Sequence, residues 1–490
     1  MQSKRKILIV GSLLIMLWCG KGFAEAYVKS ALTMGSEQWV QDEIVVKFKD
    51  TAPRAHIEQV NKRHNATVIK ESPFAHFQRI KVPAGKSRLE LIDEYKKDPD
   101  VEYAELNYLA YATFIPNDPY FVYQWNFYNS TNGGIRANLA WEITTGDPNV
   151  IIAVVDTGVA YENYQYHGKT YEQAPELSNV HFVAGYDFAN NDSHPNDDDG
   201  HGTHVTGTLA QNTDNGVGTA GLAFSCSIMP VKVLNKRGSG TYTDIADGIY
   251  FAVDNGAKVI NMSLGGGADS TTLRNACQYA YNHGVTVVCA AGNEYQQGNA
   301  PSYPAAYDEY CIAVGAVRFD KTHAYYSNTG SYLDIAAPGG DTTVDQDGDG
   351  QVDGILQQTF GSTVTSWGYY FYEGTSMATP HVSAVAAMLI SQGAQSPNEV
   401  EEALYATATD AGSPGWDAEY GWGVMDAFAA LMYQRRTGDF DGSRSVDFSD
   451  LAILAYYWLQ NEPTVDIAPS GGDGIINFRD FAILAENWLK

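Results

Sequence analysis

The strongest constraint on the fold is an alternation of apolar, strand-like runs with helical segments between residues 114 and 435. The strand-like runs cover residues 150–155, 228–234, 257–264, 285–291 and 311–317. The helical segments lie near residues 203–211, 243–255, 270–283, 378–391 and 397–408. This alternation predicts an α/β fold, with a doubly wound, mostly parallel sheet and helices on both faces. Functional side chains then lie at the carboxyl ends of strands, and Asp156 and Asn293 both follow such runs.

Three polar segments interrupt this framework and carry residue types that suit nucleophilic catalysis. Asp156 ends the first apolar run, and His201 lies in the motif Gly-His-Gly-Thr-His. Ser376 lies in the octet Gly-Thr-Ser-Met-Ala-Thr-Pro-His, just before an apolar run that is typical of a buried helix. A serine at a helix start is by itself an N-cap. The order acid, histidine, serine, however, is one of the three chain orders in which a Ser-His-Asp triad is built.

These motifs resemble those of the subtilisin-like serine peptidases, the subtilases, over residues 114–432. The segment 115–121 also resembles the mature start of the thermitase branch. The resemblance implies that Ser376 is the nucleophile, His201 the general base and then acid, and Asp156 the orienting carboxylate. The chemistry agrees, because a serine hydroxyl needs a base within hydrogen-bond reach and that base needs a partner that fixes its tautomer.

Asn293 is the candidate for a second oxyanion donor, beside the backbone N–H of Ser376. It matches the oxyanion asparagine of subtilases, whereas alone an asparagine after a strand is typical of a turn. The triad motifs favour the catalytic role. His204 lies three residues after His201, so a metal pair is one interpretation of these two side chains. Only His201 matches the catalytic position of the family, and His204 is expected to pack or to cap.

The resemblance also implies how a substrate would bind. The segment that pairs with an extended peptide would be Gly238, Ser239 and Gly240. The opposite wall would be Ser263, Leu264 and Gly265. The walls and base of the primary pocket would be Ala290, Gly292 and Ser302. An extended peptide clamped as an added strand gains backbone hydrogen bonds, and no acid stands at the pocket base. We therefore expect broad endopeptidase activity on protein or peptide substrates, with apolar or aromatic preference.

The N-terminal region predicts secretion and a zymogen. Residues 1–26 have the basic start and short apolar run of a signal peptide, so no membrane span is expected after its removal. Residues 27–113 follow a β-α-β-β-α-β pattern, with helices near 54–64 and 86–97. This pattern resembles the subtilase propeptide, which would act as an intramolecular inhibitor and be cut near 111–114. A small accessory domain is the alternative. The catalytic domain would span 114–435, and the product would be extracellular, either free or associated with a cell surface or complex.

Residues 436–490 contain an internal repeat with an offset of 30 residues, and each copy reads as an acidic loop that opens an amphipathic helix. The pair resembles a dockerin module. The ligands that this resemblance implies for Ca²⁺ are Asp439, Asp441, Ser443, Asp447 and Asp450 in the first copy and Asp466, Asp473, Asn477 and Asp480 in the second. A cohesin-like partner would bind such a module. A plain stability cap is the alternative.

Two further groups of oxygen ligands lie in the catalytic domain. The acidic stretch with calcium-loop spacing consists of Asp345, Asp347, Asp349 and Asp353, although a leucine stands at its twelfth position. A merely solvated acidic loop is the alternative. The residues that match the thermitase-type calcium site are Asp118, Glu176 and Asn215. Structural Ca²⁺ is therefore the expected cofactor.

Composition excludes some functions. The chain has 58 acidic and 31 basic residues and a net charge of −27, which argues against nucleic acid as a partner. Outside the signal segment, Cys226, Cys277, Cys289 and Cys311 allow three disulfide pairings or remain free thiols. The leading prediction is a secreted, calcium-stabilised serine endopeptidase that is made as a zymogen. A catalytically silent scaffold that docks through its C-terminal repeat is the alternative from another class.

Overall fold

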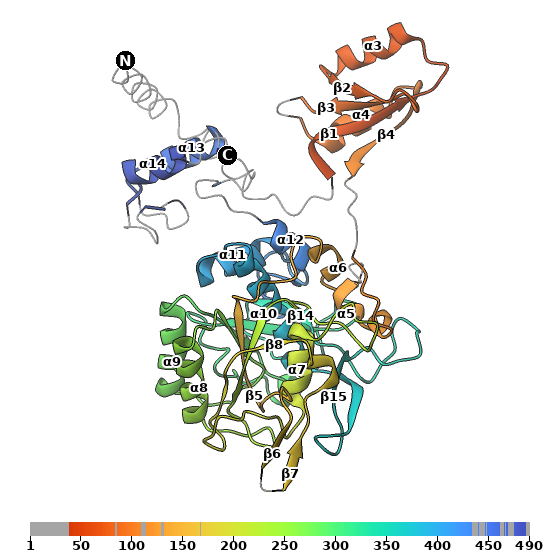
Figure 1. Ribbon diagram of the computed structural model, residues 1–490. Helices are drawn as coiled ribbons and strands as arrows, with labels where there is room; N and C mark the ends of the chain where they lie inside the picture. The colour runs from red at the N-terminus through yellow and green to blue at the C-terminus, as the bar shows by residue number, and fades with distance from the viewer. Residues whose placement is uncertain are drawn as a thin grey trace. The chain divides into compact units, whose positions relative to one another are not determined.

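The chain forms two compact units in a computed structural model, one within residues 25–112 and one from residue 113 onward (Figure 1). The residues that the structure describes are 39–83, 86–108, 114–128, 132–166, 168–433, 440, 446, 448–460, 465, 467–468 and 475–486. The predicted signal segment and most of the predicted cleavage region lie outside them. Within the described residues, no helix has the length and apolar character needed to cross a membrane.

The N-terminal unit is a four-stranded antiparallel sheet with two helices. Its elements are β1 (Trp39–Phe48), α3 (Arg54–Arg63), β2 (Thr67–Glu71), β3 (Phe77–Lys81), α4 (Arg88–Tyr95) and β4 (Val101–Tyr108). The sheet order is β2-β3-β1-β4. Alternate residues of β1, such as Ile44 and Val46, are fully buried together with Leu91 and Tyr95 of α4. The β-α-β-β-α-β order predicted from the sequence is therefore present.

The second unit is built on an eight-stranded sheet, and the predicted α/β fold is confirmed. Its strands are β5 (Ile151–Asp156), β8 (His181–Phe182), β9 (Tyr186–Asp187), β10 (Ser227–Lys232), β11 (Val259–Met262), β12 (Thr286–Ala290), β13 (Ile312–Val317) and β14 (Ile335–Pro338). Their order is β14-β13-β12-β11-β5-β10-β8, with β9 beside β10, and the pairings are parallel. The strands are almost continuously apolar because helices cover both faces of such a sheet.

Two hydrophobic cores lie on opposite faces of this sheet. Its helices are α5 (Trp125–Tyr128), α6 (Ala137–Ala140), α7 (His201–Ala210), α8 (Tyr242–Asp254), α9 (Thr271–Asn282), α10 (Thr375–Ser391), α11 (Pro397–Thr407) and α12 (Ala427–Met432). Along β5, Val154 belongs to the core that includes α7 and α10, whereas Ala153 and Val155 belong to the core that includes α8 and α9. This is the alternation that a strand requires. The five predicted helices correspond to α7 to α11.

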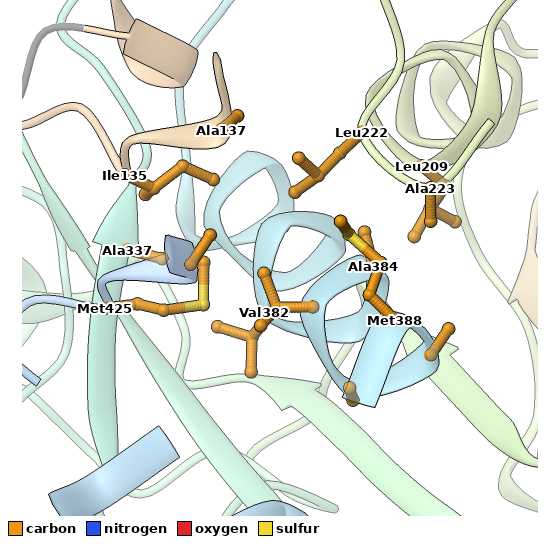
Figure 2. Packing of buried hydrophobic residues seen from close by; sticks show 14 of the residues in the cluster. Ile135, Ala137, Leu209, Leu222, Ala223, Ala337, Val382, Ala384, Met388 and Met425 are labelled. Atoms are coloured by element: carbon orange, nitrogen blue, oxygen red, sulfur yellow. The ribbon is translucent and has the colours of Figure 1, made fainter. Parts of the chain in front are cut away.

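Helix α10 is the centre of one core. Almost all of its residues are buried, which is typical of a helix enclosed on every side. Figure 2 shows Val382, Ala384 and Met388 of α10 among side chains such as Leu209 of α7 and Met425. Small residues along α10 let the surrounding elements approach closely. The enclosure fixes the N-terminal end of α10, where Ser376 lies.

Two hairpins and a C-terminal helix pair complete the chain. The hairpins are β6 (Tyr164–Tyr166) with β7 (Lys169–Tyr171), and β15 (Ile355–Phe360) with β16 (Trp367–Tyr372). The C-terminal helices are α13 (Phe448–Tyr456) and α14 (Phe478–Glu486), one in each copy of the repeat. The four cysteines at 226, 277, 289 and 311 are buried free thiols, so none of the three pairings is formed.

Candidate active site

Asp156 and His201 meet at the carboxyl edge of the sheet. Asp156 ends β5 and is fully buried, and His201 is the first residue of α7. Their closest atoms, Asp156 Oδ1 and His201 Nδ1, are 2.7 Å apart. The backbone N–H of Thr157 donates to the same carboxylate oxygen at 2.7 Å. This contact leaves the far ring nitrogen of His201 available to act on another group, as a general base requires.

A buried carboxylate shapes the turn that presents His201. Asp197 is 1% exposed and accepts hydrogen bonds from the hydroxyls of Thr157 and Thr203 and from the backbone N–H groups of Asp199, Gly200 and Thr203. Gly202 then brings α7 against the end of β5. A Cβ at position 202 would lie 2.1 Å from the carbonyl oxygen of Gly158, so only glycine allows this approach.

Pro380 explains how Ser376 is held. In an α-helix the N–H of residue 380 would donate to the carbonyl of residue 376, but proline has no N–H. The hydroxyl of Ser263 donates to this carbonyl instead, at 2.8 Å. In return, the Ser376 hydroxyl donates to the Ser263 carbonyl at 3.2 Å. Ser263 lines the same groove as His201, whereas Ser376 is not among the lining residues and its hydroxyl is bonded to Ser263 and not to His201.

Asn293 binds the start of α10 through its side-chain oxygen. Its Oδ1 accepts from the backbone N–H of Thr375 at 2.9 Å and from the Thr375 hydroxyl at 3.0 Å, which leaves Nδ2 as the outward donor. A Cβ at Gly374 would lie 3.4 Å from Asn293 Nδ2 and 3.6 Å from the backbone nitrogen of Ser376. Two N–H donors therefore border one small space, which a side chain at 374 would intrude on. Such a pair suits a developing oxyanion.

Charges around His201 favour its protonated form. Burial lowers the pKa of His201, but the charge of Asp156 and its hydrogen bond outweigh burial, and Asp197 and Asp199 add to them. The resulting pKa is raised to about 9. The charge of the neighbouring Asp198 is compensated by an ion pair, because the buried Lys232 ammonium lies 2.8 Å from it.

Two other histidines near the site are neutral packing residues. His204 is fully buried, stacks on Tyr372 with ring centroids 4.2 Å apart and hydrogen-bonds the Tyr370 carbonyl. Burial lowers its pKa to about 3. His381 is also fully buried, and its pKa falls to about 4 for the same reason. The packing role expected for His204 agrees with this geometry.

A groove of about 290 Å³ runs beside His201. It contains both predicted walls, which are Gly238, Ser239 and Gly240 on one side and Ser263, Leu264 and Gly265 on the other. The groove also contains residues that the sequence motifs did not single out, namely Thr157, Asp199, Leu234, Tyr242 and Ile245. Tyr242 and Ile245 are three positions apart on α8, directly after the exposed glycine-rich segment 238–240. This helical spacing is the sequence signal that could have identified them as groove residues.

The residues predicted for the primary pocket lie next to these walls. Ser302 Oγ would lie 2.2 Å from a Cβ at Gly265, so the two residues adjoin. Ala290 and Ser302 are buried, and a Cβ at Gly292 would collide with Asn328. None of the three lines the groove beside His201. The peptide bond between Tyr303 and Pro304 is cis.

Asp118 and Glu176 form a buried pair of carboxylates. They are 3% and 2% exposed, and neither forms an ion pair with a cationic side chain of the described residues. Burial, followed by the charge of Asp118, raises the pKa of Glu176 to about 7. The Asn215 side chain is within hydrogen-bond reach of Glu176, and its backbone N–H donates to Asp118 at 3.2 Å. These oxygen donors fit a hard cation such as Ca²⁺.

The acidic stretch between β14 and β15 converges only in part. Carboxylate oxygens of Asp345, Asp347 and Asp353 all lie within 4.8 Å of one another. Asp353 is 3% exposed, and burial, with the charges of its neighbours, raises its pKa to about 6. Asp349 is not part of this group, and its side chain accepts the backbone N–H of Gln351 instead. The converging set therefore has three of the four predicted ligands.

The predicted ligands of the C-terminal repeat are only partly described. Those outside the described residues are Asp439, Asp441, Ser443, Asp447, Asp466 and Asp473. Asp450 and Asp480 are fully buried. Asp450 accepts from the backbone N–H of Phe440, and Asp480 accepts from those of Ile467, Ala468 and Asn477. These two acids hold the loops that precede α13 and α14.

Family models and individual relatives agree with this fold. The Subtilase family model matches residues 147–423, and the model of the Fervidolysin N-terminal prodomain matches residues 26–107. The chain is 38% identical over 403 residues to the thermophilic serine proteinase of Bacillus sp. (strain AK1), which covers 81% of this chain and 88% of that protein. It is 39% identical to thermitase of Thermoactinomyces vulgaris over 65% of this chain and 100% of that protein.

A solved structure is similar in both units. It is fervidolysin from Fervidobacterium pennivorans, described as a keratinolytic enzyme related to subtilisin, with 28% identity and a TM-score of 0.52. The match covers 82% of this chain and 63% of that protein. Since the family model covers more than half of the chain, the protein belongs to the Subtilase family and is a subtilisin-like serine protease with an N-terminal prodomain.

Proposed function

We propose that this protein is a secreted, calcium-stabilised endopeptidase in which Ser376, His201, Asp156 and Asn293 perform the reaction. The observation that carries the proposal is the 2.7 Å contact between Asp156 and His201, in a groove bordered by the residue that holds Ser376. His201 takes the Ser376 proton as the hydroxyl oxygen attacks the substrate carbonyl. It then gives that proton to the leaving amine, and water reverses the sequence to release the acyl product.

The negative charge that develops on the carbonyl oxygen would be met by two donors. Asn293 Nδ2 and the Ser376 N–H border the same space, and the N-terminal end of α10 adds positive potential there. The imidazolium that forms during attack is stabilised by Asp156. The charge that raises the pKa of His201 therefore helps the transition state, although it also requires alkaline conditions for a neutral base.

Substrate would bind as an extended strand between two backbone segments. The groove beside His201 has glycine-rich walls at 238–240 and 263–265, which leave backbone groups accessible. Leu234, Tyr242, Ile245 and Leu264 give it apolar surface. Protein or peptide substrates with apolar or aromatic side chains fit this lining. The prodomain match supports synthesis as a zymogen whose N-terminal unit, residues 27–113, acts as an intramolecular inhibitor of the catalytic domain, residues 114–435.

Calcium would act on stability and take no part in the chemistry. Asp118, Glu176 and Asn215 would hold one ion, and Asp345, Asp347 and Asp353 a second. Each ion would supply positive charge beside these carboxylates, of which Asp118, Glu176 and Asp353 are buried. We also propose that residues 1–26 are a signal peptide. Residues 436–490 would form a calcium-dependent dockerin-like module that binds a cohesin-like partner. The buried Asp450 and Asp480 support the second proposal.

The direct test is the Ser376→Ala variant of the full chain. We expect the variant to remain an uncut precursor and to lose casein hydrolysis, with its fold retained. The matched control is Ser391→Ala at the far end of the same helix, whose hydroxyl donates to the Ala387 carbonyl and whose loss should leave processing intact. A Ser376→Ala protein that releases its prodomain and cleaves casein at the wild-type rate would refute the proposal.

A further inference from the structure

The hairpin formed by β6 and β7 presents a row of aromatic side chains. Strand pairing sets Tyr164 opposite Tyr171 and Tyr166 opposite Lys169, so these four side chains share one face. Gln165 and Thr170 face the other way. Figure 1 shows that the hairpin projects from the body of its unit. Tyr166 is 51% exposed, which is high for a large ring.

The rings on this face form a connected stack. Tyr164 stacks on His194, with centroids 3.8 Å apart and planes 9° from parallel. It also stacks on Tyr166 at 6.1 Å and on Tyr171 at 6.5 Å. The ammonium of Lys169 lies 4.4 Å from the Tyr171 ring centroid. We call these residues, together with His194, the tyrosine face.

Both ends of the tyrosine face are tied to the segment that leads into His201. At one end, Glu162 accepts hydrogen bonds at 2.8 Å from His194 and from Asn196. At the other end, Lys169 forms an ion pair with Asp198 at 3.3 Å. The next residue, Asp199, lines the groove beside His201. The tyrosine face is therefore linked to the rim of the substrate groove through the adjacent residues Asp198 and Asp199.

We propose that the tyrosine face binds the polypeptide chain of protein substrates beyond the residues held in the groove. This inference rests on the proposed peptidase function. Tyrosine rings offer large, rigid contact areas that are apolar on their faces and polar at the hydroxyl, so they bind varied peptide sequences at low entropic cost. The link to the groove indicates that a substrate chain is the ligand of the tyrosine face. A substrate chain that leaves the groove beside Asp199 would meet the hairpin next.

The test compares a short substrate with a long one. The variant Tyr166→Thr/Tyr171→Thr removes two rings and keeps strand-forming residues. The control Gln165→Ser/Thr170→Ser changes the opposite face of the same hairpin. Cleavage of a tetrapeptide p-nitroanilide depends on binding in the groove alone. Cleavage of unfolded casein depends also on the surface around the groove. We expect the tyrosine variant to raise KM for casein about tenfold and to leave tetrapeptide kcat/KM unchanged, with the control variant like wild type on both.

Two results would overturn the inference. They are unchanged casein kinetics in the tyrosine variant and an equal loss on both substrates. If unchanged casein kinetics came with lost binding to an insoluble polysaccharide, the tyrosine face would be a carbohydrate site instead. An equal loss would mean that the hairpin only supports the His201 segment. If the double variant does not fold, the exposed Tyr166→Thr change alone makes the same comparison. Failure of the wild-type protein to cleave the tetrapeptide would contradict the proposed function itself, and the substrate ratio could not then be measured.

Discussion

Asp156 beside His201 is buried to a similar degree as Asp118 and Glu176, yet the charges of the two regions are balanced differently. Asp156 contacts His201, and Asp198 contacts the buried Lys232. Asp118 and Glu176 instead face each other, and the pKa of Glu176 rises to about 7 through burial and the charge of Asp118. The first region carries its counter-charges within the protein, whereas the described residues supply no cationic side chain to the second.

This difference separates chemistry from stability. Burying a carboxylate is costly unless a partner compensates its charge. In the first region the partner is His201, the proposed base, so under the proposed function the compensating interaction also serves the reaction. In the Asp118 region no cationic side chain of the described residues compensates the charge, so under the proposed function a proton or a calcium ion would do so. Changes in the first region should therefore alter rates, and changes in the second should alter melting temperatures.

The largest predicted effect is on kcat/KM, and it should differ between the same acid-to-amide substitution made in each region. Asp156→Asn should lower kcat/KM on a short peptide about 10⁴-fold, because His201 loses the partner that fixes its tautomer and stabilises its charge. Asp118→Asn, assayed in excess calcium, should keep kcat/KM within about twofold per folded molecule. Both precursors would be cut by a trace of wild-type enzyme before assay. An equal loss in the two variants would contradict the separation of the regions.

The next effect concerns the oxyanion donor. Asn293→Ala should lower kcat about 10²–10³-fold with little change in KM, a range that is known for subtilisin, a member of this family, and that we adopt. Asn215→Ala is the matched control from the calcium region and should change only thermal stability. A loss expressed mainly in KM would assign Asn293 to substrate binding and not to the transition state.

Chelation should have a pH-dependent effect on stability. The pKa of Glu176 is 4.5 when unfolded and about 7 when folded without a cation. Between these values the folded chain keeps a proton that the unfolded chain has lost, so stability falls as pH rises, by up to roughly 3 kcal/mol. Bound Ca²⁺ should remove this slope. Melting of Ser376→Ala protein should therefore differ more between calcium and chelator at about pH 8 than at about pH 5.

The control for this prediction is Glu176→Gln. This variant carries no charge at position 176, so its melting temperature in chelator should depend less on pH than that of the parent. A calcium effect of the same size at both pH values would contradict the idea that the ion replaces the proton on Glu176.

The smallest predicted effect is a shift in the pH profile of kcat/KM. His201 must be neutral to act as a base, so kcat/KM should rise with pH through its raised pKa of about 9. Asp199→Asn removes one of the charges that raise this pKa, so the rising limb should move to lower pH by less than about one unit. Asp254→Asn, an exposed acid on α8, is the control. A shift toward higher pH would contradict the charge model.

Sequence patterns predicted the elements that have local signals. Apolar runs identified β5, β10, β11, β12 and β13, because strands buried on both faces are continuously apolar. The chain order of the motifs and their resemblance to those of subtilases placed Asp156 and His201 in one site. The hairpin β6–β7 was missed because its strands are short and polar, and no apolar periodicity marks them.

Tertiary charge balance could not be predicted from local patterns. Lys232 and Asp198 are 34 residues apart, and only the fold makes them an ion pair. The calcium-loop spacing implied four ligands between 345 and 353, but Asp349 bonds its own loop backbone instead. Pro380 was visible in the octet, yet its effect on the Ser376 carbonyl depends on Ser263, which lies 113 residues away.

The central claim is that Ser376 is a nucleophile activated by His201. A fluorophosphonate reagent, which reacts covalently with activated serine hydroxyls, tests it most directly when the modified residue is located by mass spectrometry. The account predicts stoichiometric labelling of Ser376 in the mature enzyme, with parallel loss of casein hydrolysis, and no labelling in a His201→Ala variant. Labelling of a different residue, or full activity in enzyme whose Ser376 carries the label, would contradict it.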